Sequence, residues 1–252
     1  VSLDLIYGAP GQTMISWRDT LQQHVALAVE HFSIYALSLD FGTPMRAWVN
    51  RGLLPEPDGD LAAEMYEWAD EELARARFAQ YEISSWAREE SPKFQTPNSK
   101  FACRHNLQYW HNLPYLGLGA GAHGCYGGYR YSNVASPTAY VERMSRDGFN
   151  PRSKATEVAT TVRLPFSPAL AESISIDART EMSETMLTGL RLTREGVRER
   201  DFRERYRVGL RDVFAKELGE LRERGLIEWN EKGARLANGG RLVANWVFEK
   251  FV

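Results

Sequence analysis

The first part of the chain alternates between apolar runs and polar turns in an order that predicts a strand, a helix and a second strand. Residues 1–7 form a short strand-like apolar run, and residues 8–11 form a turn bearing glycine and proline. Thr13 suits the N-cap of a helix to about residue 29, because apolar residues then recur at helical spacing. Residues 31–39 predict the second strand. This order favours parallel pairing with a right-handed crossover, and functional groups in such folds gather at the carboxyl ends of the strands.

The middle of the chain predicts a less regular mixture of elements. Asp60 is expected to cap a helix that ends near residue 76, and residues 80–86 predict one further strand. Residues 103–131 are rich in glycine, aromatic residues and histidine, which favours loops and short strands. A helix is expected over residues 137–147.

The composition changes near residue 175, where a weakly patterned stretch gives way to helical periodicity. The expected helices lie near residues 180–190, 199–206 and 211–225. Two short strands then flank a Lys-Gly turn at 232–233, and helices followed by such a wing are typical of a winged-helix arrangement. We therefore expect two domains, residues 1–175 and residues 176–252.

Composition narrows the class of protein. The 252 residues are 43% hydrophobic and 25% charged with a formal net charge of -2, which excludes disordered, collagen-like and low-complexity classes. The balanced charge gives no general attraction to nucleic acid or anionic membranes. No signal peptide is recognisable, and no apolar run reaches the roughly 18 residues of a membrane-spanning helix. Only Cys103 and Cys125 are present, so we expect no disulfide framework and a reducing, cytoplasmic location.

Two carboxylates lie within predicted strands. Asp4 shares a strand face with Ser2 and Ile6, where a lone carboxylate costs free energy unless it is paired or binds a polar group. Neighbouring backbone N–H groups could satisfy Asp4 equally well. Glu82 is expected to be an edge-strand carboxylate that faces water.

Glycines at 119, 121 and 124 formally match the pattern G-x-G-x-x-G. A dinucleotide site would need a helix that opens from the last glycine, and the following residues CYGGY are not a helix start. We interpret this segment as a turn in which the backbone approaches another group closely.

The segment HNLQYW at residues 105–110 places an imidazole beside two large aromatic rings. His105 with Tyr109 and Trp110 is the composition expected of a flat, apolar, metal-bearing ligand site, and Cys103 adds a second potential ligand. A packed aromatic cluster around a hydrogen-bonded histidine explains the same residues. Zinc is not expected, because the cysteines and histidines lack the paired spacing of zinc sites.

A run of arginines in the C-terminal domain could contact DNA through a winged helix. These arginines are Arg198, Arg200, Arg203, Arg205, Arg207 and Arg211. They are interleaved with glutamate and aspartate, and a mixed-sign face is usually a solvated one. We therefore expect no nucleic-acid partner.

Several of these motifs, taken in order, resemble one family. Residues 4–13, DLIYGAPGQT, are similar to the segment DLIYGLPGQT of the radical S-adenosylmethionine (SAM) coproporphyrinogen oxidase-like enzymes. GTP at 42–44, YEIS at 81–84, CRHN at 103–106 and YLGLGAGAH at 115–123 follow in that family's order and at about its spacing. The complete HNxxYW motif resembles the heme-chaperone branch of the family rather than the oxidase branch.

The resemblance covers nearly the whole chain and implies an α/β fold. This fold is a partial radical-SAM (β/α) barrel followed by a mostly helical, winged-helix-like C-terminal domain. The resemblance also implies heme, SAM and a [4Fe–4S] cluster as cofactors. The family's CxxxCxxC cluster loop belongs upstream of the strand on which this chain opens with Val1, and Cys103 and Cys125 cannot replace it. We therefore expect an N-terminally truncated member that does not by itself ligate the cluster or start radical chemistry.

The resemblance implies roles in SAM binding for three positions. Asp4 matches the strand aspartate that contacts SAM. Ser38 falls at the position of a small residue near the adenosyl group. His123 falls at a SAM-site position that is aliphatic in the oxidase branch.

The heme-handling motif matches His105, Asn106, Tyr109 and Trp110. His105 is the expected iron ligand or heme anchor, and hence the expected metal-binding residue. Tyr109 and Trp110 can stack on a porphyrin, and Asn106 would orient the imidazole or bind a propionate.

The motifs favour a heme chaperone that delivers heme to membrane respiratory enzymes. The alternative is an oxygen-independent coproporphyrinogen III oxidase, and a winged-helix interaction module is a third hypothesis. The expected partners are heme or porphyrin, SAM and heme-acceptor proteins.

Overall fold

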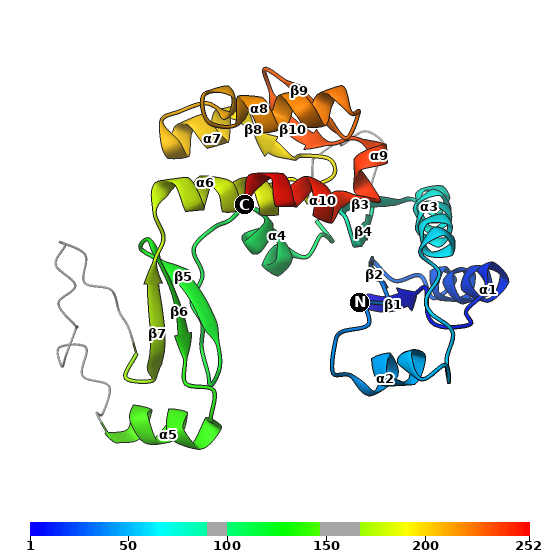
Figure 1. The fold of residues 1–252 in the computed structure, drawn as a ribbon, viewed down its shortest axis with the longest axis horizontal. Coiled ribbons are helices and arrows are strands. Elements are labelled where there is room, and N and C mark those ends of the chain that lie inside the picture. Colours follow the sequence, from blue (N-terminus) through cyan, green and yellow to red (C-terminus); the bar gives the residue numbers. More distant parts are fainter. Residues whose placement is uncertain (90–99, 147–166) are drawn as a thin grey trace. The chain divides into compact units, whose positions relative to one another are not determined.

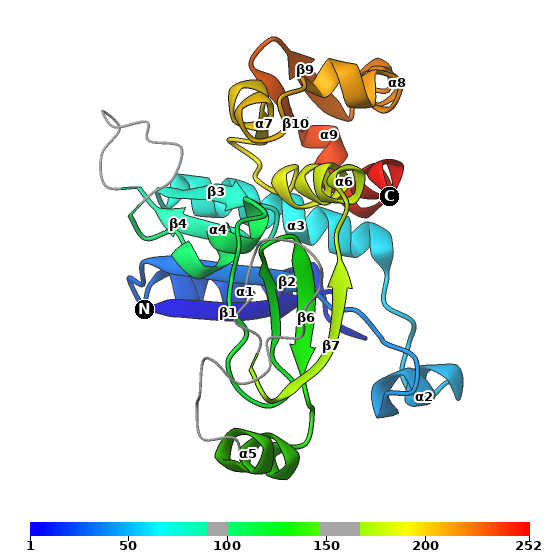
Figure 2. The same ribbon diagram turned by 90° about the vertical axis from the view of Figure 1, so that its left-hand side faces the viewer.

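The structure is a computed structural model that describes residues 1–89, 100–146 and 167–252. Contacts divide the chain into two compact units, whose elements are labelled in Figure 1 and Figure 2. The first unit contains Val1–Arg104 and Leu190–Lys250, and the second contains His105–Gly189 and Phe251–Val252. This division is discontinuous in sequence, and the domain boundary near residue 175 stays a prediction.

The predicted strand–helix–strand unit opens the first unit. Strand β1 (Ser2–Tyr7) pairs in parallel with β2 (His31–Ala36), and helix α1 (Met14–Val25) connects them. The expected N-cap is confirmed, because the Thr13 hydroxyl accepts a hydrogen bond from the Ser16 N–H at 3.2 Å. The helix ends earlier than the periodicity predicts.

Helices α2 (Pro44–Asn50) and α3 (Gly59–Arg75) follow. The expected N-cap of α3 is wrong by two residues. Asp58, not Asp60, is the N-cap, since its Oδ1 accepts hydrogen bonds from the N–H groups of Asp60 and Leu61. Asp60 instead lies in the first turn, where a negative charge still favours the helix dipole.

The single strand expected at residues 80–86 is a hairpin. Strands β3 (Phe78–Glu82) and β4 (Ser85–Arg88) pair antiparallel around a tight turn. The two residues between the strands, Ile83 and Ser84, include no Gly, Pro, Asn or Asp, so no turn signal marks the reversal in the sequence.

The four strands form one sheet in the order β1-β2-β4-β3. Successive side chains of each strand point to opposite faces, and α1 and α3 cover only one of them. Buried residues on that covered face and its helices include Leu5, Tyr7, Trp17, Leu21, Phe32, Ile34, Met65 and Leu73. The opposite face of β1 and β2 carries polar side chains instead.

Residues 190–250 rejoin the first unit and form the expected helices and wing. The elements are β8 (Val197–Arg198), α7 (Glu199–Tyr206), α8 (Leu210–Glu223), β9 (Ile227–Asn230), β10 (Gly233–Leu236), α9 (Asn238–Arg241), α10 (Ala244–Phe248) and a 3-10 turn (Glu249–Phe251). The wing is a three-stranded antiparallel sheet in the order β8-β10-β9. Gly233 is required at its turn, because φ is 142° and a Cβ would lie 2.1 Å from the Val197 carbonyl oxygen.

The second unit combines helices with an antiparallel sheet in the order β5-β6-β7. Its elements are α4 (Arg104–Trp110), β5 (His123–Tyr126), β6 (Tyr129–Asn133), α5 (Pro137–Arg146), β7 (Leu170–Ser175) and α6 (Ala178–Gly189). The helix expected near residues 137–147 is confirmed. Helix α4 was not expected, because its short aromatic and polar sequence shows no helical periodicity.

Candidate functional site

Asp4 lies on the polar face of the β1–β2 pair. The parallel register places Asp4 beside Ser33 and Ser2 beside His31. The Asp4 side chain is exposed, and its carboxylate accepts no hydrogen bond from the residues that the structure describes. The desolvation cost considered from the sequence therefore does not arise, since water or a ligand can solvate this carboxylate.

The same face contains a buried histidine that sequence analysis missed. His31 is 6% exposed, its Nδ1 lies 2.8 Å from Ser2 Oγ, and its Nε2 lies 2.9 Å from Tyr81 Oη. Tyr81 Oη also accepts a hydrogen bond from the Cys103 N–H at 3.1 Å. Because α4 begins at the next residue, this hydrogen-bond chain fixes the backbone directly before the HNLQYW helix. A histidine that opens an apolar strand gives no local sign of these distant partners.

Burial sets the protonation state of this hydrogen-bond chain. It lowers the pKa of His31 below its ordinary value of 6.5, and the negative charge of Asp4 acts in the opposite direction. Burial also raises the pKa of Tyr81 to about 12. Near neutral pH the imidazole is therefore uncharged, with one donor and one acceptor nitrogen, and the Tyr81 hydroxyl keeps its proton.

Glu82 does not face water, contrary to the expectation from sequence. Its side chain is 2% exposed and pairs with Arg191 at 3.4 Å. The partner comes from the returning C-terminal segment, so local sequence could not indicate it. A buried carboxylate held by a guanidinium in this way is a structural ion pair.

The residues of the HNLQYW segment all lie in helix α4. The His105 and Tyr109 rings lie one turn apart, with centroids 5.0 Å apart and planes at 89°, and Tyr109 packs against Tyr115 at 4.7 Å. His105 is exposed, and no described residue hydrogen-bonds to its ring nitrogens. Asn106 and Trp110 are half-buried and also lie one turn apart. His105 is thus not the internally bonded histidine of the alternative interpretation, and its imidazole is available to a ligand.

The glycine-rich segment is a close-approach turn, as expected. A Cβ at Gly117 would lie 2.3 Å from the His123 carbonyl oxygen, and one at Gly124 would lie 2.2 Å from a tyrosine ring of β6. The buried Asn133 amide donates to the carbonyl oxygens of Gly117 at 3.2 Å and Gly119 at 2.9 Å. Gly124 lies within β5, so no helix opens from the G-x-G-x-x-G match and the dinucleotide interpretation fails.

The other candidate SAM positions, Ser38 and His123, belong to different units of the chain. Ser38 is exposed and follows the end of β2, further along the chain than Ser33, the lateral partner of Asp4. His123 is exposed at the start of β5 in the second unit, whereas Asp4 and Ser38 belong to the first. The structure therefore brings the α4 residues together on one helix and places Asp4 and Ser38 in the first unit.

The cysteines do not form a metal site. Cys103 and Cys125 are half-buried and are not in a disulfide. Across residues 1–89, 100–146 and 167–252, no group of three or more His, Cys, Asp or Glu side chains is arranged to hold a metal ion. A cluster that needs three cysteines therefore does not fit the two cysteines of this chain. Over the same residues, no helix is both long and apolar enough to cross a membrane.

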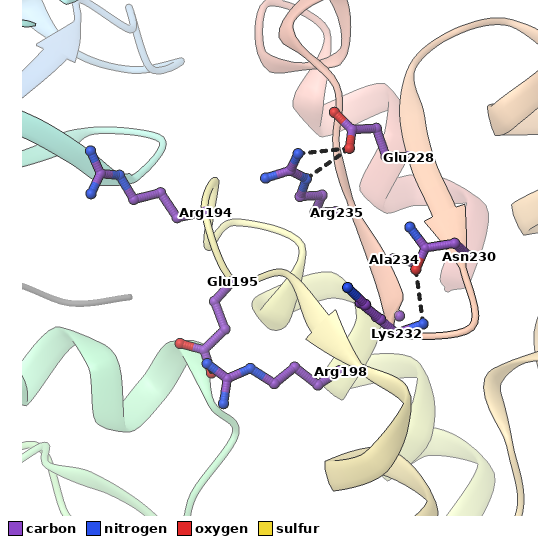
Figure 3. A pocket seen from close by; sticks show the side chains of 9 residues that line it. Arg194, Glu195, Arg198, Glu228, Asn230, Lys232, Ala234 and Arg235 are labelled. Atoms are coloured by element: carbon purple, nitrogen blue, oxygen red, sulfur yellow. Dashed lines mark hydrogen bonds and ion pairs between the residues drawn. The ribbon is translucent and has the colours of Figure 1, made fainter. Parts of the chain in front are cut away.

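The wing carries a pocket of about 610 Å³ with mixed charge, shown in Figure 3. Arg235 donates two hydrogen bonds to Glu228, at 3.0 and 2.7 Å, and Arg198 pairs with Glu195 at 3.3 Å. Further along, Arg203 pairs with Glu199. These carboxylates offset much of the arginine charge, as the sequence interpretation assumed, and the absence of a nucleic-acid partner stays a prediction.

Comparisons with known proteins point to one group. The family "HemN C-terminal domain" matches residues 176–243. The solved structure of coproporphyrinogen III oxidase (HemN) from Escherichia coli, titled a radical SAM enzyme, superposes with a TM-score of 0.67 at 18% identity, covering 99% of this chain and 54% of that one. The chain thus has the α/β fold of that radical SAM enzyme, and its C-terminal part matches the HemN C-terminal domain.

Sequence relatives narrow the class further. Heme chaperone HemW of Bacillus subtilis is 33% identical over the whole chain, and that of Mycobacterium tuberculosis is 34% identical over 98% of it. The mouse protein named radical S-adenosyl methionine domain-containing protein 1, mitochondrial, is 33% identical over 96%. The chain is thus similar over nearly its whole length to proteins named heme chaperone HemW. It spans 59%, 54% and 51% of the lengths of these three relatives.

Proposed function

We propose that this chain is the heme-handling part of a heme chaperone. The observation that carries the proposal is the exposed His105 imidazole, which lies edge-on to Tyr109 on α4 and has both nitrogens available. A neutral imidazole is a common axial ligand of heme iron. The names of the HemW relatives support heme rather than another flat ligand.

Each residue of the α4 surface has a distinct role in this proposal. His105 binds the iron through a ring nitrogen, and the edge contact with Tyr109 restricts the orientation of the imidazole. Tyr109 and Trp110 offer aromatic faces and edges to the macrocycle. Asn106 supplies an amide that can hydrogen-bond to a propionate. The hydrogen bond from Cys103 N–H to Tyr81 steadies the residue before α4.

SAM binding is assigned to the polar sheet face in the same proposal. The exposed Asp4 carboxylate can accept hydrogen bonds from ribose hydroxyls or the amino group of SAM, and the exposed Ser38 leaves room for a nucleoside. His123 is the third proposed contact. SAM bound to a reduced cluster supplies radical chemistry in enzymes of this type, but this chain holds no ligand set for that cluster.

The chain is proposed to work in the cytoplasm, with heme or porphyrin, SAM and heme-acceptor proteins, including membrane respiratory enzymes, as partners. The second candidate function is oxygen-independent oxidation of coproporphyrinogen III, which the fold similarity to the oxidase HemN favours. The complete HNxxYW motif favours the chaperone.

Heme titration tests the chaperone proposal. The Soret band of added hemin should shift and saturate with the chain, and His105→Ala should weaken binding at least about 10-fold and move the band of any remaining complex. The matched control is His24→Ala, whose imidazole lies on α1 and is bonded to the Thr20 carbonyl oxygen. Unchanged affinity and spectrum in His105→Ala would remove His105 from the site. Decarboxylation of coproporphyrinogen III by a longer protein that contains this chain and a CxxxCxxC loop would favour the oxidase.

A further inference from the structure

A second pocket, of about 380 Å³, opens at the carboxyl ends of β1 and β2. Tyr7 and Ala36, the last residues of these strands, line it together with Tyr66 of α3. The returning segment around Val243 and Trp246 forms another wall. Tyr7 belongs to the helix-covered face of β1, whereas Asp4 belongs to the polar face, so this pocket is distinct from the proposed SAM contacts.

Two hydrogen-bond donors of this pocket, the Tyr7 hydroxyl and the Arg241 Nε, have no partner among the described residues. Tyr7 is only 7% exposed, and no described residue hydrogen-bonds to its hydroxyl. The neighbouring Tyr66 shows the usual arrangement, since its hydroxyl accepts from Gln80 Nε2 at 2.6 Å and donates to the Ile83 carbonyl oxygen at 3.1 Å. The Tyr7 hydroxyl is accessible to solvent, whereas the Arg241 Nε is buried without a partner, so a bound acceptor accounts for Arg241.

The charges around the pocket define what that acceptor is. Arg241 and Arg191 line it, with side chains 20% and 22% exposed. Arg241 pairs with Asp70 at 3.3 Å and Arg191 with Glu82 at 3.4 Å, so both ion pairs are long and the local charge is balanced. Two guanidinium groups next to a hydroxyl donor favour an anionic oxygen. The carboxylates of Asp70 and Glu82 disfavour a second negative charge on the ligand. A monoanion therefore fits better than a phosphate dianion.

The remaining walls are apolar, which indicates a ligand with an apolar body. Ile34, Ala36, Leu242 and Val243 present aliphatic side chains, and Trp246 presents an indole ring. We propose that this pocket binds a small amphipathic monocarboxylate, whose carboxylate accepts a hydrogen bond from the Tyr7 hydroxyl beside Arg191 and Arg241. Its apolar body lies against the aliphatic walls and Trp246. Burial raises the pKa of Tyr7, which keeps this hydroxyl protonated as a donor.

Benzoate is a suitable probe, because it joins a carboxylate to a flat apolar ring. Saturation-transfer NMR should show contact between benzoate and the chain, and benzoate should raise the thermal midpoint. Tyr7→Phe removes only the hydroxyl, and affinity for benzoate should fall about 10-fold, as expected for one hydrogen bond to a charged group. The matched control Tyr126→Phe, on an exposed tyrosine of β5, should leave benzoate affinity unchanged.

The same variant also reports on the apo protein. Since the Tyr7 hydroxyl has no described partner, Tyr7→Phe should leave the thermal midpoint without benzoate unchanged or slightly higher. The proposal is overturned if benzoate does not bind, or if Tyr7→Phe binds it as tightly as the original chain. Equal affinity for benzyl alcohol would remove the role of the carboxylate. Equal affinity for inorganic phosphate would replace the monocarboxylate by a phosphate site.

Discussion

His31 on β2 and His105 on α4 are the same side chain in opposite surroundings. His31 is buried, both its nitrogens are hydrogen-bonded, and burial lowers its pKa. His105 is exposed, touches only the edge of Tyr109 among the described rings, and keeps both nitrogens available. Both nitrogens of the His31 imidazole bind groups of the protein, whereas the His105 imidazole is free to bind a ligand.

Exposure and unused hydrogen-bonding capacity distinguish His105, the proposed ligand-binding histidine, from the structural His31. Residue type and local sequence do not. The two histidines are connected through the backbone, because the Tyr81 hydroxyl joins His31 to the Cys103 N–H next to α4. Substitutions in this hydrogen-bond chain can therefore separate effects on stability from effects on the proposed heme binding.

The largest expected effect on stability comes from His31→Ala. The substitution leaves a cavity and removes the buried partner of Ser2 and Tyr81, so the free energy of unfolding should fall by about 3 kcal/mol. Urea denaturation followed by circular dichroism measures this change. The matched variant His105→Ala should change it by less than about 0.5 kcal/mol, because an exposed side chain without hydrogen bonds is removed. Equal decreases in the free energy of unfolding in the two variants would contradict the distinction between a structural His31 and an uncommitted His105.

A smaller effect is expected from Tyr81→Phe. The ring stays in place, but the His31 Nε2 and the Cys103 N–H lose their common partner, which should cost about 1 to 2 kcal/mol. Amide hydrogen exchange at Cys103 should become faster. Unchanged exchange there would show that Tyr81 does not hold the start of α4.

The smallest expected effect is on the pH dependence of the free energy of unfolding. Because the pKa of His31 in the folded chain lies below 6.5, the unfolded chain binds more protons at that position when the pH falls below this value. His31 therefore makes stability decrease as the pH drops from about 6.5 through its folded pKa. Denaturation curves at several pH values should show this decrease, and His31→Ala should reduce it. The same slope in both proteins would assign the pH dependence to other groups.

Much of the local structure follows from short-range patterning. The strand–helix–strand start, the Thr13 cap and the hairpin of the wing depend on propensity, capping and turn chemistry within a few residues. The β3–β4 hairpin was missed because its turn at Ile83 and Ser84 has no Gly, Pro, Asn or Asp. The environment of Glu82 was missed because Arg191 lies far away in sequence.

The candidate binding residues likewise divide into those that a local motif indicates and those that only the tertiary structure brings together. His105, Asn106, Tyr109 and Trp110 were found because they lie in one short motif, and the α-helical turn then sets His105 against Tyr109. The Tyr7 pocket could not be anticipated, since its walls come from opposite ends of the chain.

The sequence by itself determined the resemblance to one family, the order of the first elements and the aromatic motif around His105. These features depend on residues that are close in sequence, so their spacing and chemistry are evident without the folded structure. Only the tertiary structure decided which histidine is buried, where Glu82 finds its partner and which side chains line the Tyr7 pocket. Burial and long-range pairing arise when distant segments meet, and the free energy of a polar group depends on those neighbours rather than on its place in the chain.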